Sequence, residues 1–322
     1  MIRDAAPART KRWRLRDVNV PGRPTVRPFR WPDLDERAAL ADAIDGGGEP
    51  LERRRESLRR LYRQPGMAPE RDCFTALLDG RQVGCATLHV EAPIGRGVLE
   101  CGVRPDARRR GVGRALVDAA VAHARGLGLQ VLDFDASEDD EAAARLFASA
   151  GFAIVRRHLH LRIERLAPPP QREPPGRVVR PLRREDVPAL AEVQNAAFTG
   201  SWGYCPNTPD QLDYRIYELP LDRPDDIVVV EEAGRLVGYC WAQRRGRGEP
   251  GVVGMVGVLP EMQGRGVGWA ATAAALGALA EAGARPINIT VDEANTPAVN
   301  LYRSLGFETA WRSVWYRREL SA

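Results

Sequence analysis

A glycine-rich segment in the C-terminal half combines the residue types that a phosphate site needs. Gln263, Arg265 and two glycines follow an apolar run (252–258) and precede an alanine-rich run (268–282) that begins with a third glycine. We expect a strand and a helix on the two sides of this turn. The first N–H groups of a helix lack intrahelical partners, and the helix dipole favours negative charge there. The sequence therefore predicts a phosphate site, where glycines allow a close approach of the backbone and Arg265 adds a cation.

Two other kinds of phosphate loop do not fit this segment. A dinucleotide-binding G-x-G-x-x-G loop would need its last glycine at Trp269 in the second half and at Leu116 in the first. A Walker A loop needs Gly-Lys-Ser/Thr, which does not occur in the sequence.

The chain contains a duplication that repeats the glycine-rich segment. The first copy, Arg110-Gly111-Val112-Gly113, matches Arg265-Gly266-Val267-Gly268, and three other pairs of short matches keep the same order at offsets of 153 to 155 residues. A repeat of this length predicts two domains of ordinary size, joined here by a proline-rich spacer. The predicted boundaries are a basic flexible tail (1–22), an N-terminal domain (23–167), the spacer (168–176) and a C-terminal domain (177–322).

Hydrophobic periodicity predicts the same mixed α/β arrangement in each copy. A short strand and a helix come first, followed by a hairpin, a buried strand, a long helix, another strand and a short helix. Two more strands are expected to close each domain. In the second copy these predicted elements are 178–182, a helix from Asp186, 227–231 with 236–242, 252–258, 268–282, 287–291 and 296–304.

The glycine-rich segment resembles the Q/R-x-x-G-x-G/A motif of the GCN5-related N-acetyltransferase (GNAT) family, whose loop holds the pyrophosphate of acetyl-CoA. Gln263 opens the motif in the second copy and Arg108 opens it in the first. The resemblance implies two tandem GNAT-fold domains and acetyl-CoA as cofactor. The cofactor-binding residues that it implies are Gln263, Gly264, Arg265, Gly266, Val267, Gly268 and Trp269, with Arg108, Arg109, Arg110, Gly111, Val112 and Gly113 in the first copy.

A second segment, 295–307, resembles the family signature N-x-x-A-x-x-L-Y-x-x-x-G-F. We expect Thr296 to cap its helix. The resemblance implies that Asn295 and Asn300 lie along the CoA arm and that Tyr302 is the general acid that protonates the departing thiolate. The alternative for Tyr302 is a tyrosine packed at a helix end.

The family also implies a role for the strand before the loop, which splays from its neighbour in GNAT enzymes. The backbone N–H groups of Val256, Gly257 and Val258 would then contact the pantetheine and the thioester oxygen. A general base is harder to find, because this strand carries no carboxylate. Glu249 is our candidate, although a solvated loop charge is the alternative, and Asp292 is a further guess.

The acceptor is expected to be a small-molecule primary amine that attacks the thioester directly in a ternary complex. Phe198, Trp202 and Tyr204 lie on a Gly/Pro-rich segment where GNAT enzymes place the substrate-facing loop, so we predict that they line the acceptor pocket. These rings would equally serve to anchor the loop to the core.

The first copy departs from the family pattern and is predicted to be catalytically degenerate. Phe147 stands where the second copy has Tyr302, and Asp140 stands where it has Asn295. Phenylalanine cannot donate a proton. An acidic run (138–141) also sits poorly beside an anionic cofactor, though it suits a helix N-terminus, so we expect this copy to bind CoA weakly or not at all. Glu100, within its central strand, would suit a general base, although a partly exposed strand residue without a catalytic role is the alternative.

Tandem GNAT enzymes that resemble this chain include the mycothiol synthases. The acidic residue that they use on the acceptor falls at Val252 here, and a substrate-contacting tyrosine falls at Thr290. These departures place the mycothiol precursor in doubt as the acceptor. Two other functions stay open: a non-catalytic acyl-CoA-binding or regulatory protein, and an acetyltransferase recruited to nucleic acid by its basic tail.

Composition excludes several other classes of protein. The net charge of +4 is mild, so nucleic-acid binding is not expected. The sequence has no apolar run long enough to span a membrane and no signal-peptide pattern, which makes the cytoplasm the expected compartment. Its five cysteines form no C-x-x-C pair, and His158 and His160 share one strand face without a third ligand, so no metal is expected.

Overall fold

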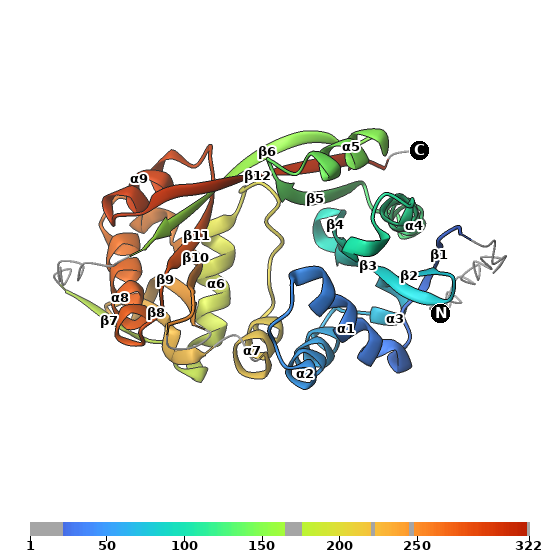
Figure 1. Cartoon of the computed structure of the whole chain (residues 1–322). Helices are drawn as coiled ribbons and strands as arrows, with labels where there is room; N and C mark the ends of the chain where they lie inside the picture. The colour runs from blue at the N-terminus through green and yellow to red at the C-terminus, as the bar shows by residue number, and fades with distance from the viewer. Residues whose placement is uncertain (1–21, 165–175, 220–222, 245–247, 321–322) are drawn as a thin grey trace, which may run out of the picture.

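The computed structural model describes residues 22–164, 176–219, 223–244 and 248–320, and these form one twelve-stranded sheet with helices on both faces (Figure 1). The predicted tail and proline-rich spacer lie almost entirely outside the described residues. None of the described helices is long and apolar enough to cross a membrane.

The first half contains six strands and five helices among the described residues. In chain order they are β1 (Thr25–Pro28), α1 (Leu34–Asp45), α2 (Leu51–Tyr62), α3 (Pro69–Asp72), β2 (Cys73–Leu78), β3 (Arg81–Glu91), β4 (Arg96–Val103), α4 (Val112–Gly126), β5 (Val131–Ser137), α5 (Glu141–Ser149) and β6 (Ala153–Ile163).

The second half repeats this order, with one helix fewer before its central hairpin. Its elements are β7 (Arg177–Pro181), α6 (Val187–Phe198), α7 (Pro209–Glu218), β8 (Ile227–Glu232), β9 (Arg235–Arg244), β10 (Gly251–Val258), α8 (Val267–Glu281), β11 (Ile287–Asp292), α9 (Thr296–Ser304) and β12 (Glu308–Glu319). Every element predicted from the sequence between 178 and 304 is present, and α7 was not predicted.

Repeated glycines set the spacing between the sheet and its long helices. A Cβ atom on Gly84 of β3 would lie 2.9 Å from Val112 of α4, and one on Gly238 of β9 would lie 2.5 Å from Val267 of α8. Each helix therefore begins directly over the central hairpin of its half, which explains why these two glycines recur in the duplication. Each half of the molecule has its own large hydrophobic core.

The last strand of each half belongs to the sheet of the other half. The strand order is β1-β2-β3-β4-β5-β12-β6-β11-β10-β9-β8-β7, so β6 pairs with β11 and β12 pairs with β5. These two strands also pair with each other, and they cross from one half to the other at the top of Figure 1.

The expectation that two strands close each domain is wrong, because a single long strand follows α5 and another follows α9. The last strand of each half also packs in the core of the other half. Leu159 and Leu161 of β6 lie in the core of the second half, while Val314 and Tyr316 of β12 lie in the core of the first. Each half therefore needs the other to complete its hydrophobic core.

Candidate active site

The glycine-rich loop of the second half opens toward solvent at the start of α8. Gly264 and Gly266 have φ angles of +72° and +81°, and a Cβ atom on either would meet no atom within 4 Å. Glycine is therefore favoured at both positions by the left-handed backbone and not by crowding. The residues 263–266 are exposed, and α8 begins directly after them. This geometry suits an anion held by the free N–H groups of the helix.

The first half holds its corresponding loop in the same shape. Gly111 has φ +79°, and Arg109, which stands where the second copy has Gly264, has φ +62°. The side chains that open the two motifs also behave alike: Arg108 donates to the Val103 carbonyl at 3.2 Å, and Gln263 donates to the Val258 carbonyl at 3.4 Å. Arg109 therefore adopts a conformation that disfavours side chains, which shows how closely this loop shape is retained.

Arg177, at the start of β7, is a loop contact that the sequence analysis missed. Its guanidinium donates to the carbonyl of Arg265 at 2.7 Å and forms an ion pair with Glu232 at 2.9 Å. This side chain is largely buried, so it fixes the loop and places a second cation beside it. No local motif signals this role, because β7 and the loop are 88 residues apart.

The strand before the loop splays from its neighbour. Strand β10 pairs with β9 along its whole length but with β11 only over Gly251–Val253, and a bulge at Gly254 interrupts the β9 ladder. Beyond that point, the edge of β10 that faces β11 has no strand partner among the described residues. Val256, Gly257 and Val258 lie on this unpaired stretch.

The first half splays in the same place but without the bulge. Strand β4 pairs with β5 only over Arg96–Val98, whereas its register with β3 continues unbroken. Bulges concentrate beside active sites because they redirect backbone groups. This is a structural difference between the two clefts that no sequence motif indicated.

Tyr302 lies in the core of the second half, packed at the end of α9 as in the alternative that the sequence left open. It is 6% exposed, and its ring packs against Phe307 with the ring centroids 6.0 Å apart. Burial raises the pKa of Tyr302 above its ordinary value, so the phenol is protonated at neutral pH.

Asn295 caps α9, and its side chain accepts a hydrogen bond from the Ala298 N–H at 3.2 Å. The prediction that Thr296 is the cap is therefore wrong by one residue, because Thr296 is already the first residue of the helix. Asn300 lies exposed on the same helix.

The matching residues of the first half are arranged for packing. Phe147 is 1% exposed and stacks on Phe134 with ring centroids 3.9 Å apart. Asp140 caps α5 and accepts from the N–H groups of Ala142 and Ala143. The acidic run before α5 is therefore explained by helix capping and the helix dipole.

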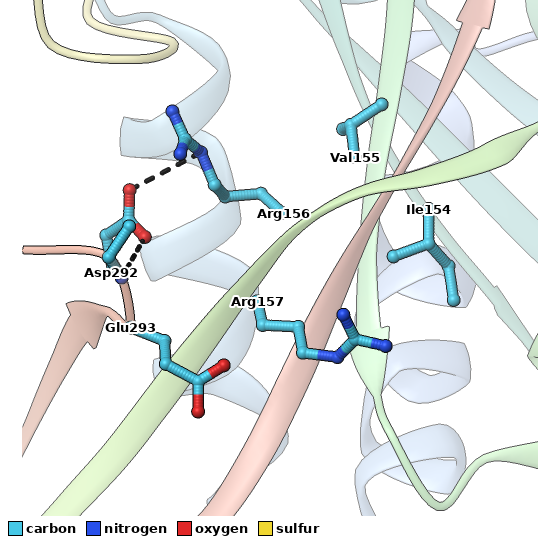
Figure 2. Close-up of a pocket in the computed structure, with 7 residues that line it drawn as sticks. Ile154, Val155, Arg156, Arg157, Asp292 and Glu293 are labelled. Carbon is cyan, nitrogen blue, oxygen red and sulfur yellow. Dashed lines mark hydrogen bonds and ion pairs between the residues drawn. The ribbon is translucent and has the colours of Figure 1, made fainter.

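Neither carboxylate suggested for the second half lies free in the splayed region. Glu249 is exposed and precedes β10 at the end opposite the cofactor loop, roughly 15 Å along the strand from Gly254 at about 3.3 Å per residue. Asp292 accepts from the Ala294 N–H at 2.9 Å and pairs with Arg156 at 3.4 Å. Asp292 lines a pocket of about 320 Å³ together with residues of β6, and Figure 2 shows these side chains.

The first half does hold a carboxylate on its splayed strand. Glu100 lies 3.2 Å from the imidazole of His89, and the hydrogen bond from His89 lowers the pKa of Glu100. The two halves thus differ: the second has the tyrosine, and the first has a carboxylate on its splayed strand.

A sequence model of the Acetyltransferase (GNAT) family matches residues 37–152 and 187–307, one stretch in each half. The chain belongs to this family. It is an acetyl-CoA-dependent N-acetyltransferase, with two tandem GNAT folds, that acts on a small molecule.

Relatives of this GNAT acetyltransferase match nearly its whole length. A mycothiol acetyltransferase of Thermobispora bispora is 38% identical over 301 residues, which cover 88% of this chain and 94% of that protein. One of Kytococcus sedentarius is 35% identical, over 88% of this chain and 91% of that protein. Among solved structures, a tandem GNAT protein from the clavulanic acid biosynthesis pathway has the same fold, with a TM-score of 0.72 at 20% identity over 93% of this chain and 99% of that one.

The loop after α6 of this GNAT acetyltransferase is tied to the helix by a polar network. The Tyr204 hydroxyl donates to Asn195 at 2.6 Å, and the Asn207 side chain donates to buried Gln194 at 3.1 Å. Phe198 stacks on Tyr204 with centroids 5.2 Å apart. Two of the three rings predicted for the acceptor pocket therefore also anchor this loop, which is the alternative that the sequence left open.

Beneath this network lies a buried hydroxyl that the sequence analysis did not single out. Tyr239 of β9 is fully buried, and its hydroxyl has no hydrogen-bond partner among the described residues. Its ring lies over Gly257, whose Cβ atom, if present, would be 3.2 Å from that hydroxyl. A polar atom thus adjoins the unpaired stretch of β10 on the side of α6.

The face of the sheet that carries Tyr239 continues across β11, β6 and β12 as a polar surface. Thr290 of β11 lies 3.0 Å from His160 of β6, which lies 2.9 Å from Ser313 of β12. His160 also stacks on Trp311, with centroids 3.4 Å apart, and Trp311 is 43% exposed. Val252, on the same face of β10, is 36% exposed. Residues from both halves thus meet where the acceptor is expected.

Proposed function

We propose that acetyl transfer takes place in the second half, from acetyl-CoA to the primary amine of a small hydroxylated molecule. The observation that carries this proposal is that the second half combines an open phosphate loop, a bulged and splayed strand and a buried tyrosine in the family's signature position. The first half has the loop and the splay but lacks the bulge and the tyrosine.

Each feature suits one step of the reaction. The N–H groups at the start of α8, with Arg265 and Arg177, hold the pyrophosphate. The free edge of β10 donates to the thioester oxygen, on which negative charge develops as the amine nitrogen attacks the carbonyl carbon. When the carbon–sulfur bond breaks, Tyr302 gives its proton to the thiolate, and the proton that the attacking nitrogen loses passes through water and restores the phenol. Gly254 and the bulge turn the free edge of the strand toward the cleft.

The acceptor that we propose is of the mycothiol-precursor class, because the relatives that match most of the chain are named mycothiol acetyltransferases. The polar face formed by Thr290, His160 and Ser313 suits a hydroxylated molecule, since it offers donors and acceptors at short spacing. Val252 and Thr290 replace an acidic residue and a tyrosine of the related enzymes. We therefore expect the acceptor to be held by different contacts.

The proposed compartment is the cytoplasm. All five cysteines are free thiols, and burial raises the pKa of Cys101 and Cys240 to about 12. Unpaired, unreactive thiols of this kind are typical of a reducing environment.

The decisive test compares Tyr302→Phe with Tyr316→Phe, a matched control because Tyr316 is a similarly buried tyrosine in the core of the first half. We expect Tyr302→Phe to lower kcat about 100-fold or more, as loss of a general acid does, with acetyl-CoA affinity unchanged. The control should keep its kcat. The mycothiol precursor and simple amines would be offered as acceptors. Equal kcat for the wild type and Tyr302→Phe would contradict the role of Tyr302, and acetyl-CoA binding without transfer to any amine would favour a non-catalytic binding protein.

A further inference from the structure

The loop that borders the acceptor side, residues 199–208, also contacts the opposite half of the molecule. We call it the acceptor loop. It connects α6 and α7 of the second half, and the yellow segment of Figure 1 follows it between the two halves. One end is tied to α6 through Tyr204 and Asn207, as described above.

Trp202, near the tip of the acceptor loop, lies among three guanidinium groups. The Cζ atoms of Arg96, Arg156 and Arg317 lie 5.7, 5.5 and 5.2 Å from the centre of its ring. Arg96 belongs to β4 of the first half, and Arg317 belongs to the part of β12 that completes the first half's sheet. Cation–π contacts of this kind hold an indole ring in place.

Arg96 fixes the backbone of the loop as well as the ring of Trp202. Its guanidinium donates to the carbonyl of Gly203 and pairs with Glu91 of its own half. The Arg96 side chain is only 8% exposed, and its contact with the loop leaves no room for a Cβ atom on Gly203. Gly203 also has φ +67°, so glycine is required there for two independent reasons.

A fully buried carboxylate holds the arginines in position. Asp133 of β5 accepts two hydrogen bonds of 2.7 Å from Arg317, and it lies 3.5 Å from Arg96. A buried charge is costly unless it is paired, so Asp133 holds Arg317 in place, and Asp133 and Glu91 together hold Arg96 from the side of the first half. The first half therefore presents a preformed binding surface to Trp202 and Gly203.

We propose that Arg96, Asp133 and Arg317 form an anchor through which the first half positions the acceptor loop over the cleft of the second. This proposal rests on the proposed function, since it assigns the loop to acceptor binding. It gives the first half a role in the reaction although Phe147 replaces its tyrosine. Trp202 and Arg96 are then positioning residues. Trp202 acts on the acceptor pocket by holding the acceptor loop in place.

The sharpest test is a pair of glycine variants within the same loop. Gly203→Ala places a methyl group against Arg96, whereas Gly200→Ala meets no atom within 4 Å. The control is matched because Gly200 has φ +78° and so carries a similar backbone penalty. We expect Gly203→Ala to raise the KM for the acceptor at least tenfold and to leave the Kd for acetyl-CoA unchanged. Gly200→Ala should raise the acceptor KM much less than Gly203→Ala does.

A second pair of variants tests the anchor from the side of the first half. Arg96→Met removes the guanidinium, and Arg71→Met is its control, because Arg71 pairs with another buried carboxylate, Asp72, that does not face the loop. Arg96→Met should reproduce the effect of Gly203→Ala on the acceptor KM, with partial recovery in Arg96→Lys. An unchanged acceptor KM in both Gly203→Ala and Arg96→Met would overturn the proposal, as would an equal weakening of acetyl-CoA binding.

Hydrogen exchange separates failure of this proposal from failure of the proposed function, because it needs no substrate. Amides of residues 199–208 should exchange at least tenfold faster in Gly203→Ala than in Gly200→Ala, with the rest of the second half unchanged. Equal exchange in the two variants would show that the first half does not hold the loop, whatever the activity of the enzyme. Faster exchange without any effect on the acceptor KM would leave the anchor in place but refute its role in catalysis.

Discussion

The side chain of Thr290 reaches His160 across the boundary between the two halves of the chain. Its hydroxyl oxygen lies 3.0 Å from Nδ1 of the imidazole, although the residues are 130 positions apart in sequence. His160 comes from β6, the strand that the first half contributes to the sheet of the second. The acceptor side of the candidate site is thus built from both copies of the duplication.

This contact predicts a dependence of stability on pH. Burial, followed by the nearby charge of His158, lowers the pKa of His160 from 6.5 to about 4. Between these values the unfolded chain binds a proton that the folded protein does not, so stability falls as the pH drops from about 6.5 to about 4. Urea unfolding at pH 7 and pH 5 should show a smaller loss for His160→Gln than for the wild type. The same loss in both proteins would contradict the assignment to His160.

Acetyl-CoA binding should depend on the loop of the second half more than on that of the first. We expect Gly266→Glu to weaken binding at least 100-fold, because it places a carboxylate where the pyrophosphate is proposed to bind. Gly111→Glu makes the same change at φ +79° in the first half and is the matched control. Calorimetry on both variants measures the affinity and the number of sites. Loss of one of two sites in Gly111→Glu would show that the first half binds CoA as well.

The close packing of Tyr239 on Gly257 should make that glycine hard to replace. A Cβ atom there would lie 3.0 Å from Cζ of the fully buried Tyr239 ring and closer still to the ring edge. We expect Gly257→Ala to cost about 1–3 kcal/mol, the usual cost of overpacking. Gly254→Ala is the control, since its nearest contact would be 3.6 Å. Chemical denaturation checks both, and equal costs would argue against the packing explanation.

Arg109 allows a measurement of the strain in the first loop. Because Arg109 has φ +62°, Arg109→Gly should be more stable than Arg109→Ala by roughly 1 kcal/mol. At Arg110, whose φ is not positive, the order should be reversed, since glycine costs backbone entropy on folding. Thermal unfolding of the four variants provides the comparison. The same order at both positions would mean that the loop relaxes at no cost.

Asp133 should be among the most costly charged residues to neutralise. It is fully buried and bonded to Arg317, so Asp133→Asn leaves a guanidinium partly unpaired and should cost about 3 kcal/mol. Asp139→Asn, at an exposed position, should change stability by less than about 0.5 kcal/mol. Since Arg317 lies on β12, the result also measures how firmly the exchanged strand is held. A small effect in both variants would contradict the anchor.

The sequence by itself determined the local features of this protein. The order of strands and helices in the second half follows from hydrophobic periodicity, which depends only on neighbours along the chain. The loop around Gly266 and the helix around Tyr302 are recognisable because their function needs fixed residue types at fixed short spacings. The fold of two tandem GNAT domains was predicted correctly for the same reason.

Only the tertiary structure decided which strand pairs with which and which half each side chain serves. An apolar strand such as β6 fits the core of either half equally well, so its pairing with β11 depends on long-range contacts that leave no local pattern. The same holds for Arg177 at the cofactor loop and for Arg96 at Trp202, whose partners are 88 and 107 residues away. Chemistry set by short spacing can be read from the sequence, whereas positioning by distant residues emerges only when the chain is folded.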